Sequence, residues 1–166
     1  MVNHPQKAKL YPSNTFTTRI DKIVYGGYGL CNYNGIKVFV PYGVPLDYVQ
    51  LKIKERKKTY YKATIHKLIE PSPFRTTPPC QYFTVCGGCD LQHIKYENQL
   101  RIKQEFFIES LQRISKLNLK DLPALSSSQP FHYRNKTQYP LSERPLRIGF
   151  YQKFSHNVLN IDQCLL

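Results

Sequence analysis

The sequence lacks any long apolar run. No stretch approaches the ~18 consecutive apolar residues of a membrane-spanning helix. The N-terminus, MVNHPQKAKLYPS, also lacks the apolar core of a secretory signal peptide. These absences predict a cytoplasmic protein that makes no membrane contact. Stable disulfides are uncommon in that compartment, so clustered cysteines there more often bind metal or do redox work.

Acidic residues are scarce, because 11 Asp and Glu stand against 24 Lys and Arg, a formal net charge of +13. The excess is uneven: residues 1–79 contain 13 basic and 4 acidic side chains, whereas residues 80–166 contain 11 and 7. Such a surface attracts polyanions through counterion release, and nucleic acid is the commonest of them. The alternative is a basic surface that only keeps the protein soluble. The charge therefore favours nucleic-acid binding and leaves that alternative open.

Residues 15–70 have the pattern of successive short strands, after a polar tail at 1–14. In VQLKIK, for example, Val49, Leu51 and Ile53 alternate with polar residues. Glycines and prolines separate the strands, as turns require. About five short strands without a helix predict a small closed β-barrel of the OB type. Cys31, isolated in this segment, is predicted to be a small buried apolar side chain.

The outer face of the predicted barrel carries basic and aromatic side chains. Barrels of this type bind single-stranded nucleic acid on such a face. The candidate RNA-binding residues here are Lys52, Lys54, Lys57, Lys58, Tyr60 and Lys62. The alternative is a solvated hairpin that its lysines keep soluble.

A second domain is predicted at residues 80–166, after a linker at 71–79. The linker lies within EPSPFRTTPPC, whose four prolines are typical of a stiff spacer. Residues 96 to about 117 have apolar residues at helical spacing on several faces, which predicts one long helix. The segments YRNKTQYPL, LRIGFYQ and HNVLNID indicate strands, so this domain is expected to be α+β with a mostly antiparallel sheet.

Four of the five cysteines form a C-x5-C-x2-C pattern with a distant fourth member: Cys80, Cys86, Cys89 and Cys164. Four thiolates are the number that a structural zinc site or an iron–sulfur cluster requires. A thioredoxin-like redox pair is an alternative for C-x-x-C, but it gives Cys80 no role. The spacing matches neither a zinc ribbon nor a ferredoxin. The pattern therefore predicts metal binding without identifying the metal.

The segment CQYFTVCGGCDLQHIKYENQLRIKQ resembles the signature of the SAM-dependent uracil-C5 RNA methyltransferases that carry a 4Fe-4S cluster. IDKIVYGGYGLCNYNGIKVFVPYGVPLDYVQLKI is similar to the TRAM domain, the RNA-binding β-barrel that precedes the cluster in that family. FHYRNKTQYPL and IGFYQKFSHNVLNIDQC resemble its central domain. The resemblance covers nearly all of residues 15–166. It implies a mainly β chain, with an OB-like TRAM barrel followed by an α+β iron–sulfur domain.

The resemblance also implies a cofactor and a partner. The 4Fe-4S ligands fall on Cys80, Cys86, Cys89 and Cys164. The partner is RNA containing a target uridine, with 23S ribosomal RNA favoured over tRNA, and we expect a monomer. RNA contacts are implied for Arg134, Asn135 and Lys136, with Lys153 and His156 as further candidates. A structural ion pair is the alternative for Arg134.

In that family the SAM site and the catalytic cysteine lie in a Rossmann-like domain after the last cluster ligand. This sequence has no counterpart of that domain, so we expect no catalytic residue, no SAM site and no methyl transfer by this chain alone. The alternative is a free-standing, non-enzymatic RNA-binding iron–sulfur protein. One local departure from the family is Leu46, which stands where a glycine is usual before Asp47. We expect Leu46 to be strained if the turn requires a positive φ.

Overall fold

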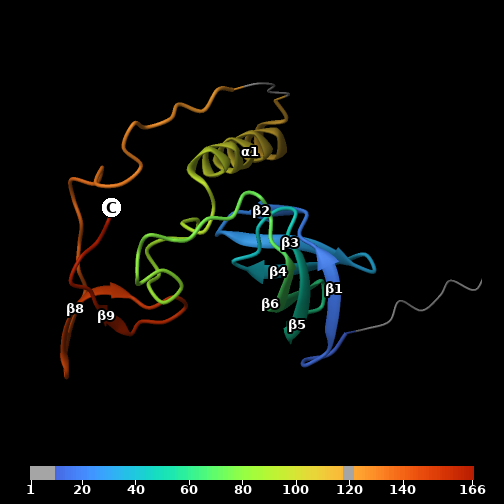
Figure 1. Ribbon diagram of the computed structural model, residues 1–166, viewed down its shortest axis with the longest axis horizontal. Coiled ribbons are helices and arrows are strands. Elements are labelled where there is room, and N and C mark those ends of the chain that lie inside the picture. Colours follow the sequence, from blue (N-terminus) through green and yellow to red (C-terminus); the bar gives the residue numbers. More distant parts are fainter. Residues whose placement is uncertain (1–9, 118–121) are drawn as a thin grey trace, which may run out of the picture. The chain divides into compact units, whose positions relative to one another are not determined.

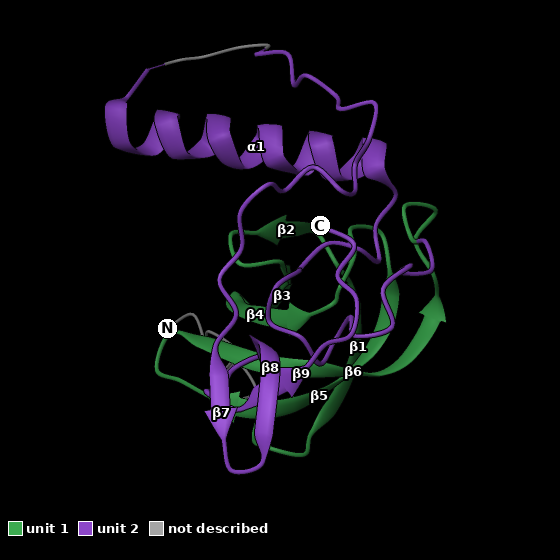
Figure 2. Ribbon diagram, turned by 90° about the vertical axis from the view of Figure 1, so that its left-hand side faces the viewer, with its two compact units in different colours: residues 1–75 green, residues 76–166 purple. Residues whose placement is uncertain are grey.

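The computed structural model describes residues 10–117 and 122–166, so most of the predicted polar tail, residues 1–9, lies outside the described residues. The chain divides into two compact units between Arg75 and Thr76 (Figure 2). Strands predominate and one helix is present among the described residues, which confirms the prediction of a mainly β chain. The described residues include no helix long and apolar enough to span a bilayer.

The first unit is one six-stranded sheet in the order β1-β5-β6-β4-β3-β2 (Figure 1). Its strands are β1 (Thr15–Arg19), β2 (Lys22–Val24), β3 (Tyr28–Tyr33), β4 (Ile36–Pro41), β5 (Tyr48–Arg56) and β6 (Tyr60–Glu70). All neighbours pair antiparallel except β4 and β6. β1 and β2 lie at opposite ends of this order, yet only Ile20 and Asp21 separate them in the chain. The sheet must therefore curl until its two edges approach each other.

The strand count differs from the expected five because the first predicted strand is interrupted. The chain leaves β1 at Ile20, whose N–H donates to Asp47 O at 2.9 Å, and enters β2 after Asp21, whose N–H donates to Leu30 O at 2.9 Å. One continuous apolar pattern thus supplies strands at both ends of the sheet. A closed barrel of the OB type stays a prediction.

Alternating side chains fill the inside of the curl. Val49, Leu51 and Ile53 are at most 1% exposed, which confirms the inner face predicted for this strand. Cys31 is also 1% exposed, as predicted, and burial raises the pKa of its thiol to about 12, with a smaller contribution from the charge of Asp21.

The chain that precedes β1 also belongs to this unit. Leu10 is 8% exposed and packs in the core. Ser13 N–H donates to Ile53 O at 3.0 Å, and Ile53 N–H donates to Asn14 O at 2.9 Å. Residues 10–14 are therefore attached to the sheet, although the sequence placed them in a polar tail.

The turn between β4 and β5 is anchored by a fully buried carboxylate. Asp47 accepts from Val44 N–H at 2.7 Å and from Ser72 N–H at 2.9 Å. Arg75 completes the site with Nε and Nη2 at 2.8 and 2.6 Å from the two carboxylate oxygens. Leu46, just before Asp47, has φ +75°, so this turn does require the left-handed region that favours glycine.

The second unit contains the helix α1 (Tyr96–Ser115) and an antiparallel sheet in the order β7-β8-β9 (Figure 2). The strands are β7 (Leu141–Glu143), β8 (Leu146–Tyr151) and β9 (Val158–Asn160). The helix ends two residues before the predicted boundary, because Lys116 adopts a left-handed φ of 60°. Residues 133–140 form no strand, in contrast to the prediction for YRNKTQYPL. The later two segments are strands, as predicted.

Candidate functional site

The first three cysteines lie on a loop of consecutive turns between residues 80 and 94. Phe83 N–H donates to Cys80 O at 3.1 Å, and Cys86 N–H donates to Tyr82 O at 2.8 Å. These bonds double the chain back on itself. Cys80 and Cys86 are thereby brought to one end of the loop, although five residues separate them.

The end of β8 holds this loop in place. Cys86 pairs with Gln152 in an isolated antiparallel bridge, and Gly87 N–H donates to Tyr151 O at 2.9 Å. A Cβ on Gly87 would lie 3.1 Å from that same oxygen, so the close approach favours glycine here. Gly88 N–H reaches back to Cys86 Sγ at 3.4 Å. The CGGC element thus fits the loop against a strand and also directs a backbone donor at sulfur.

The distant cysteine reaches the same place through the segment that follows β9. Tyr82 Oη donates to Asp162 Oδ2 at 3.1 Å and accepts from Asp162 N–H at 3.3 Å. Leu165 O accepts from His132 N–H at 2.8 Å. Cys164 lies between these two attachments, so the chain is fixed on both sides of it.

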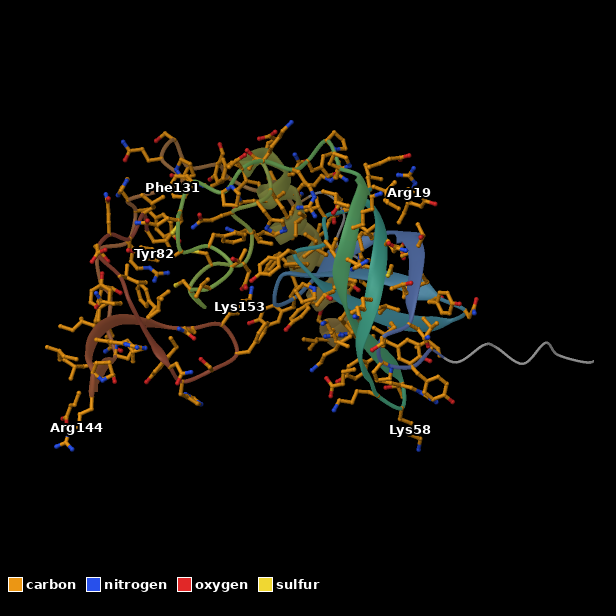
Figure 3. All side chains as sticks on the ribbon, turned by 60° about the horizontal axis from the view of Figure 1, so that its bottom comes forward. Arg19, Lys58, Tyr82, Phe131, Arg144 and Lys153 are labelled. Atoms are coloured by element: carbon orange, nitrogen blue, oxygen red, sulfur yellow. The ribbon has the colours of Figure 1, made fainter. Side chains whose placement is uncertain are left out.

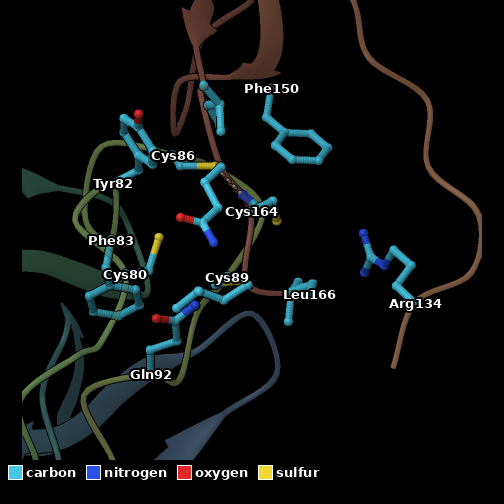
Figure 4. Close-up of a pocket in the computed structure, with 14 residues that line it drawn as sticks. Cys80, Tyr82, Phe83, Cys86, Cys89, Gln92, Arg134, Phe150, Cys164 and Leu166 are labelled. Atoms are coloured by element: carbon cyan, nitrogen blue, oxygen red, sulfur yellow. Dashed lines mark hydrogen bonds between the residues drawn. The ribbon is translucent and has the colours of Figure 1, made fainter. Parts of the chain in front are cut away.

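Together these contacts bring the four predicted ligands to the lining of one pocket (Figure 4). Phe83, Gln92 and Phe150 also line it, and Figure 4 shows Arg134 on a separate segment facing the thiols across a gap. In the described part of the chain, no three His, Cys, Asp or Glu side chains are placed to hold one metal ion. The thiols are therefore gathered but do not converge on a single point.

The pocket disfavours the thiolate form at two of its cysteines. Burial raises the pKa of Cys86, with a smaller opposing contribution from Gly88 N–H. Burial likewise raises the pKa of Cys89, and a hydrogen bond from the Gln92 side chain opposes it. The other cysteines add charge repulsion at both positions. A cation bound among the sulfurs would remove that repulsion, because thiolate is the form that ligates metal.

Four thiols are the donor set that either a structural zinc ion or an iron–sulfur cluster requires. Tetrahedral zinc needs all four sulfurs at about 2.3 Å from one point. A cubane cluster is a larger body that binds one thiolate at each iron, so its ligands surround a volume. In this chain the four thiols line one pocket, and hydrogen-bond donors are directed at two of them.

Lys153, predicted to contact RNA, lies against the cysteine loop. Its Nζ is 2.8 Å from Asp90 Oδ1, and only 14% of its side chain is exposed. The backbone N–H of Lys153 donates to Val85 O at 2.8 Å. In this structure Lys153 fixes the residues on both sides of the CGGC element. His156 lies further along, with its ring 5.6 Å from that of Tyr151.

The motif residues Arg134, Asn135 and Lys136 are all exposed and line a second, more polar pocket with Cys164 and Phe150. Arg134 forms no ion pair with any residue in 10–117 or 122–166. Its guanidinium is therefore available at the rim of the thiol pocket. The RNA contacts of these residues stay a prediction.

The basic candidates of the first unit lie on β5, β6 and the turn between them. Lys52 and Lys54 point outward on β5, and Lys58 lies at the tip of the turn, directed away from the sheet (Figure 3). Lys57 and Lys62 both pair with Glu55, the latter at 3.0 Å. Two of the predicted lysines thus share one carboxylate.

Aromatic residues beside Tyr60 escaped the sequence analysis. Phe39 on β4 lies with its ring centroid 5.3 Å from Tyr60 and 6.4 Å from Tyr28 on β3, with both pairs nearly perpendicular. The alternation along each strand would have placed all three on the outer face. The alternation pattern does not predict that β4 and β6 pair in parallel, which makes Phe39 a neighbour of Tyr60.

The chain resembles one class of curated proteins, the RNA methyltransferases. It is 40% identical over 150 residues to an uncharacterized RNA methyltransferase of Aquifex aeolicus, an alignment covering 89% of this chain and 34% of that protein. It is 32% identical over 168 residues to the 23S rRNA (uracil(1939)-C(5))-methyltransferase RlmD of Histophilus somni, covering 99% of this chain and 38% of that protein. This chain therefore spans about a third of the length of these relatives.

A solved structure shows the same likeness. The tRNA (uracil-54, C5)-methyltransferase of Pyrococcus abyssi, in complex with S-adenosyl-L-homocysteine, superposes with a TM-score of 0.55 at 28% sequence identity. The match covers 89% of this chain and 32% of that one. No protein-family model matches the chain. The relatives support the resemblance to uracil-C5 RNA methyltransferases that the cysteine segment first suggested.

Proposed function

We propose that this chain is the RNA-recognising portion of a SAM-dependent uracil-C5 RNA methyltransferase that forms 5-methyluridine. The observation that carries the proposal is the pocket in which Cys164 meets the cysteine loop, because it joins residues more than seventy positions apart in a sequence whose relatives are RNA methyltransferases. We propose that the methyl transfer itself requires a part of the full-length relatives beyond the third of their length that this sequence matches.

The first unit is proposed to be a TRAM-type barrel that holds RNA. The support is a small curled sheet with outward basic and aromatic side chains and a strongly positive sequence. We favour 23S ribosomal RNA over tRNA as the substrate, because the RlmD alignment extends over nearly the whole chain. We further propose a cytoplasmic monomer.

A 4Fe-4S cluster is proposed for the thiol pocket, held by Cys80, Cys86, Cys89 and Cys164. When bound there, it would supply a rigid cross-link between the cysteine loop and the segment after β9. The chain's own residues position the ligands: Tyr82 and Asp162 fix one side, and Gly87 fixes the loop to β8. That cross-link would stabilise the exposed segment around Arg134, which lines the same pocket.

The metal assignment can be tested on the whole chain purified without oxygen. We expect a brown protein containing iron and acid-labile sulfide. Cys86→Ser should lose both, whereas Cys31→Ser, at a buried thiol of the first unit, should retain them. A colourless protein with stoichiometric zinc would overturn the cluster.

The functional assignment needs a separate assay. The chain should bind ribosomal RNA and should transfer no label from radioactive SAM to it. Label recovered in 5-methyluridine would contradict the proposal that catalysis requires the part of the relatives that this sequence does not match.

The alternative, a free-standing iron–sulfur protein that binds RNA without any enzyme, is less well supported, since the relatives named above are methyltransferases. The gene separates the two proposals. A reading frame that continues into a Rossmann-like sequence supports the methyltransferase, and unrelated sequence after a stop codon supports the alternative.

A further inference from the structure

The outer face of the β3–β4–β6 region carries a diagonal row of aromatic rings. Tyr28, Phe39 and Tyr60 come from three adjacent strands, and each ring contacts the next edge to face. All three side chains remain partly exposed. Packing therefore fixes the orientation of the rings without burying them, which lowers the entropy lost when a ligand stacks on them.

Basic side chains accompany this row. Lys62 is the register partner of Phe39, and Lys37 that of Tyr60, so both lie on the same face as the rings. Hydrogen bonding to Glu55 raises the pKa of Lys62, and the nearby phenol groups of Tyr60 and Tyr28 add smaller contributions. Lys62 Nζ also pairs with Glu55 at 3.0 Å, whereas Lys37 is exposed opposite Tyr60. By strand register both lysines lie on the face of the rings, as a site for a phosphate next to a stacked base requires.

A fourth aromatic residue lies at the turn between β2 and β3, three positions before Tyr28. Tyr25 is 92% exposed, the largest exposure among the described large hydrophobic side chains. Gly26 and Gly27 follow it with φ of 87° and 75°, and the chain then enters β3 at Tyr28. The turn thus presents an aromatic side chain to solvent where packing in the core cannot account for it.

From this arrangement we infer that Tyr25, Tyr28, Phe39 and Tyr60, with Lys37 and Lys62, form a stacking surface for unpaired bases of RNA. We call it the aromatic row. The inference rests on the proposed RNA-binding function and identifies the form of RNA that the first unit takes: an extended single strand rather than a duplex.

The orientation of the rings supports an extended strand. Neighbouring rings are nearly perpendicular, at 89° and 87°, so bases stacked on two neighbouring rings cannot be parallel to one another. Bases on neighbouring rings must therefore be unstacked from one another. Paired bases cannot separate in this way, and side chains read RNA bases mainly where they are splayed out. The positive charge of this region disfavours a neutral protein partner in the same place.

The test uses the full 166-residue chain and a fluorescent single-stranded RNA of about 12 nucleotides, within the span that one such module covers. Affinity is measured by anisotropy at about 50 and 200 mM salt, against the same RNA annealed into a duplex. We expect Phe39→Leu and Tyr60→Leu to weaken single-strand binding at least about fivefold, the smallest loss typical of one base–aromatic stack. The salt dependence should not change, because neither substitution alters charge.

Two further variants serve as controls for folding and position. Tyr25→Ala removes an exposed ring that contributes little to the core, so its expected fivefold loss of affinity, again about one stack, does not reflect unfolding. Tyr48→Leu removes a ring from β5, where Tyr48 lies 5.0 Å from the Arg19 guanidinium, and should leave RNA binding unchanged.

The possible results separate the two claims. If the unmodified chain binds no RNA, the proposed function falls and the aromatic row falls with it. If it binds RNA and the Tyr25, Phe39 and Tyr60 variants bind equally well, only the aromatic row is overturned. Equal affinity for the duplex and the single strand would also overturn it, since stacking requires unpaired bases.

Discussion

Asp47 and Glu70 allow the effect of burial on an ion pair to be measured within one unit. Asp47 Oδ2 lies 2.6 Å from Arg75 Nη2, and Glu70 Oε2 lies 2.7 Å from Arg19 Nη2. The two pairs are thus nearly identical in length. They differ in environment, because Asp47 is 0% exposed and the Glu70 side chain is 60% exposed.

Replacing each carboxylate by its amide removes one charge at nearly constant volume. In Asp47→Asn the amide oxygen retains one acceptor position, but the NH2 group then faces donors: Val44 N–H, Ser72 N–H or the guanidinium of Arg75. Removing one partner of a buried ion pair costs about 3–5 kcal/mol. In Glu70→Gln water replaces the lost contact, and an exposed pair contributes less than about 1 kcal/mol.

The measurement is thermal unfolding of the first unit, followed by circular dichroism. One kcal/mol shifts the midpoint of a domain this size by roughly 4–8 °C, so we expect Asp47→Asn to lower it by roughly 12–40 °C and Glu70→Gln by less than about 8 °C. Similar shifts for both variants would refute the argument that burial, rather than distance, determines the contribution of these pairs.

Two other predictions concern the same unit. Leu46→Gly should raise the free energy of unfolding by up to about 1 kcal/mol, because glycine relieves the strain of φ +75° at a residue that is already 50% exposed. Leu46→Ala keeps the Cβ and should not raise the free energy of unfolding. Equal urea midpoints for Leu46→Gly and Leu46→Ala would contradict this prediction. Because the pKa of Cys31 rises from 9.0 to about 12 on folding, stability is fully present below about pH 9 and is lost as the pH rises from there toward about 12. Cys31→Ala should lose less stability than the unmodified chain between pH 8 and about pH 10.5 in urea titrations, and parallel losses would show that the thiol does not contribute.

The strands and the inner faces of the first unit were predictable because a period-2 pattern is local. Val49, Leu51 and Ile53 could be assigned to the core without knowing what they contact. The break at Ile20 and Asp21 could not be predicted in the same way, since it arises from hydrogen bonds to Asp47 and Leu30, far along the chain. The role of Asp47 was missed for the same reason: its partners Ser72 and Arg75 lie in a segment that composition assigned to a spacer.

The cysteine ligands were chosen from their number and from a family resemblance, and the structure then brought all four to one pocket. The residues that hold the pocket together were not predicted, because Tyr82 and Asp162 are eighty positions apart and no local pattern pairs them. Lys153 was a candidate RNA contact implied by the resemblance, and that role stays a prediction. Its ion pair with Asp90 on the cysteine loop was not predicted, because 63 positions separate the two residues.

The attachments around the thiol pocket bear on what a cluster could add to this fold. In a zinc finger the metal supplies most of the folding free energy, because few other contacts exist. Here the backbone bond from Gly87 to Tyr151, the Tyr82–Asp162 pair and the Asp90–Lys153 pair already hold the loop, the strand and the final segment together. A cluster would therefore bind to a site that is largely formed. Its main effect would fall on the least supported part of the lining, the exposed segment around Arg134, where the proposed RNA contacts lie.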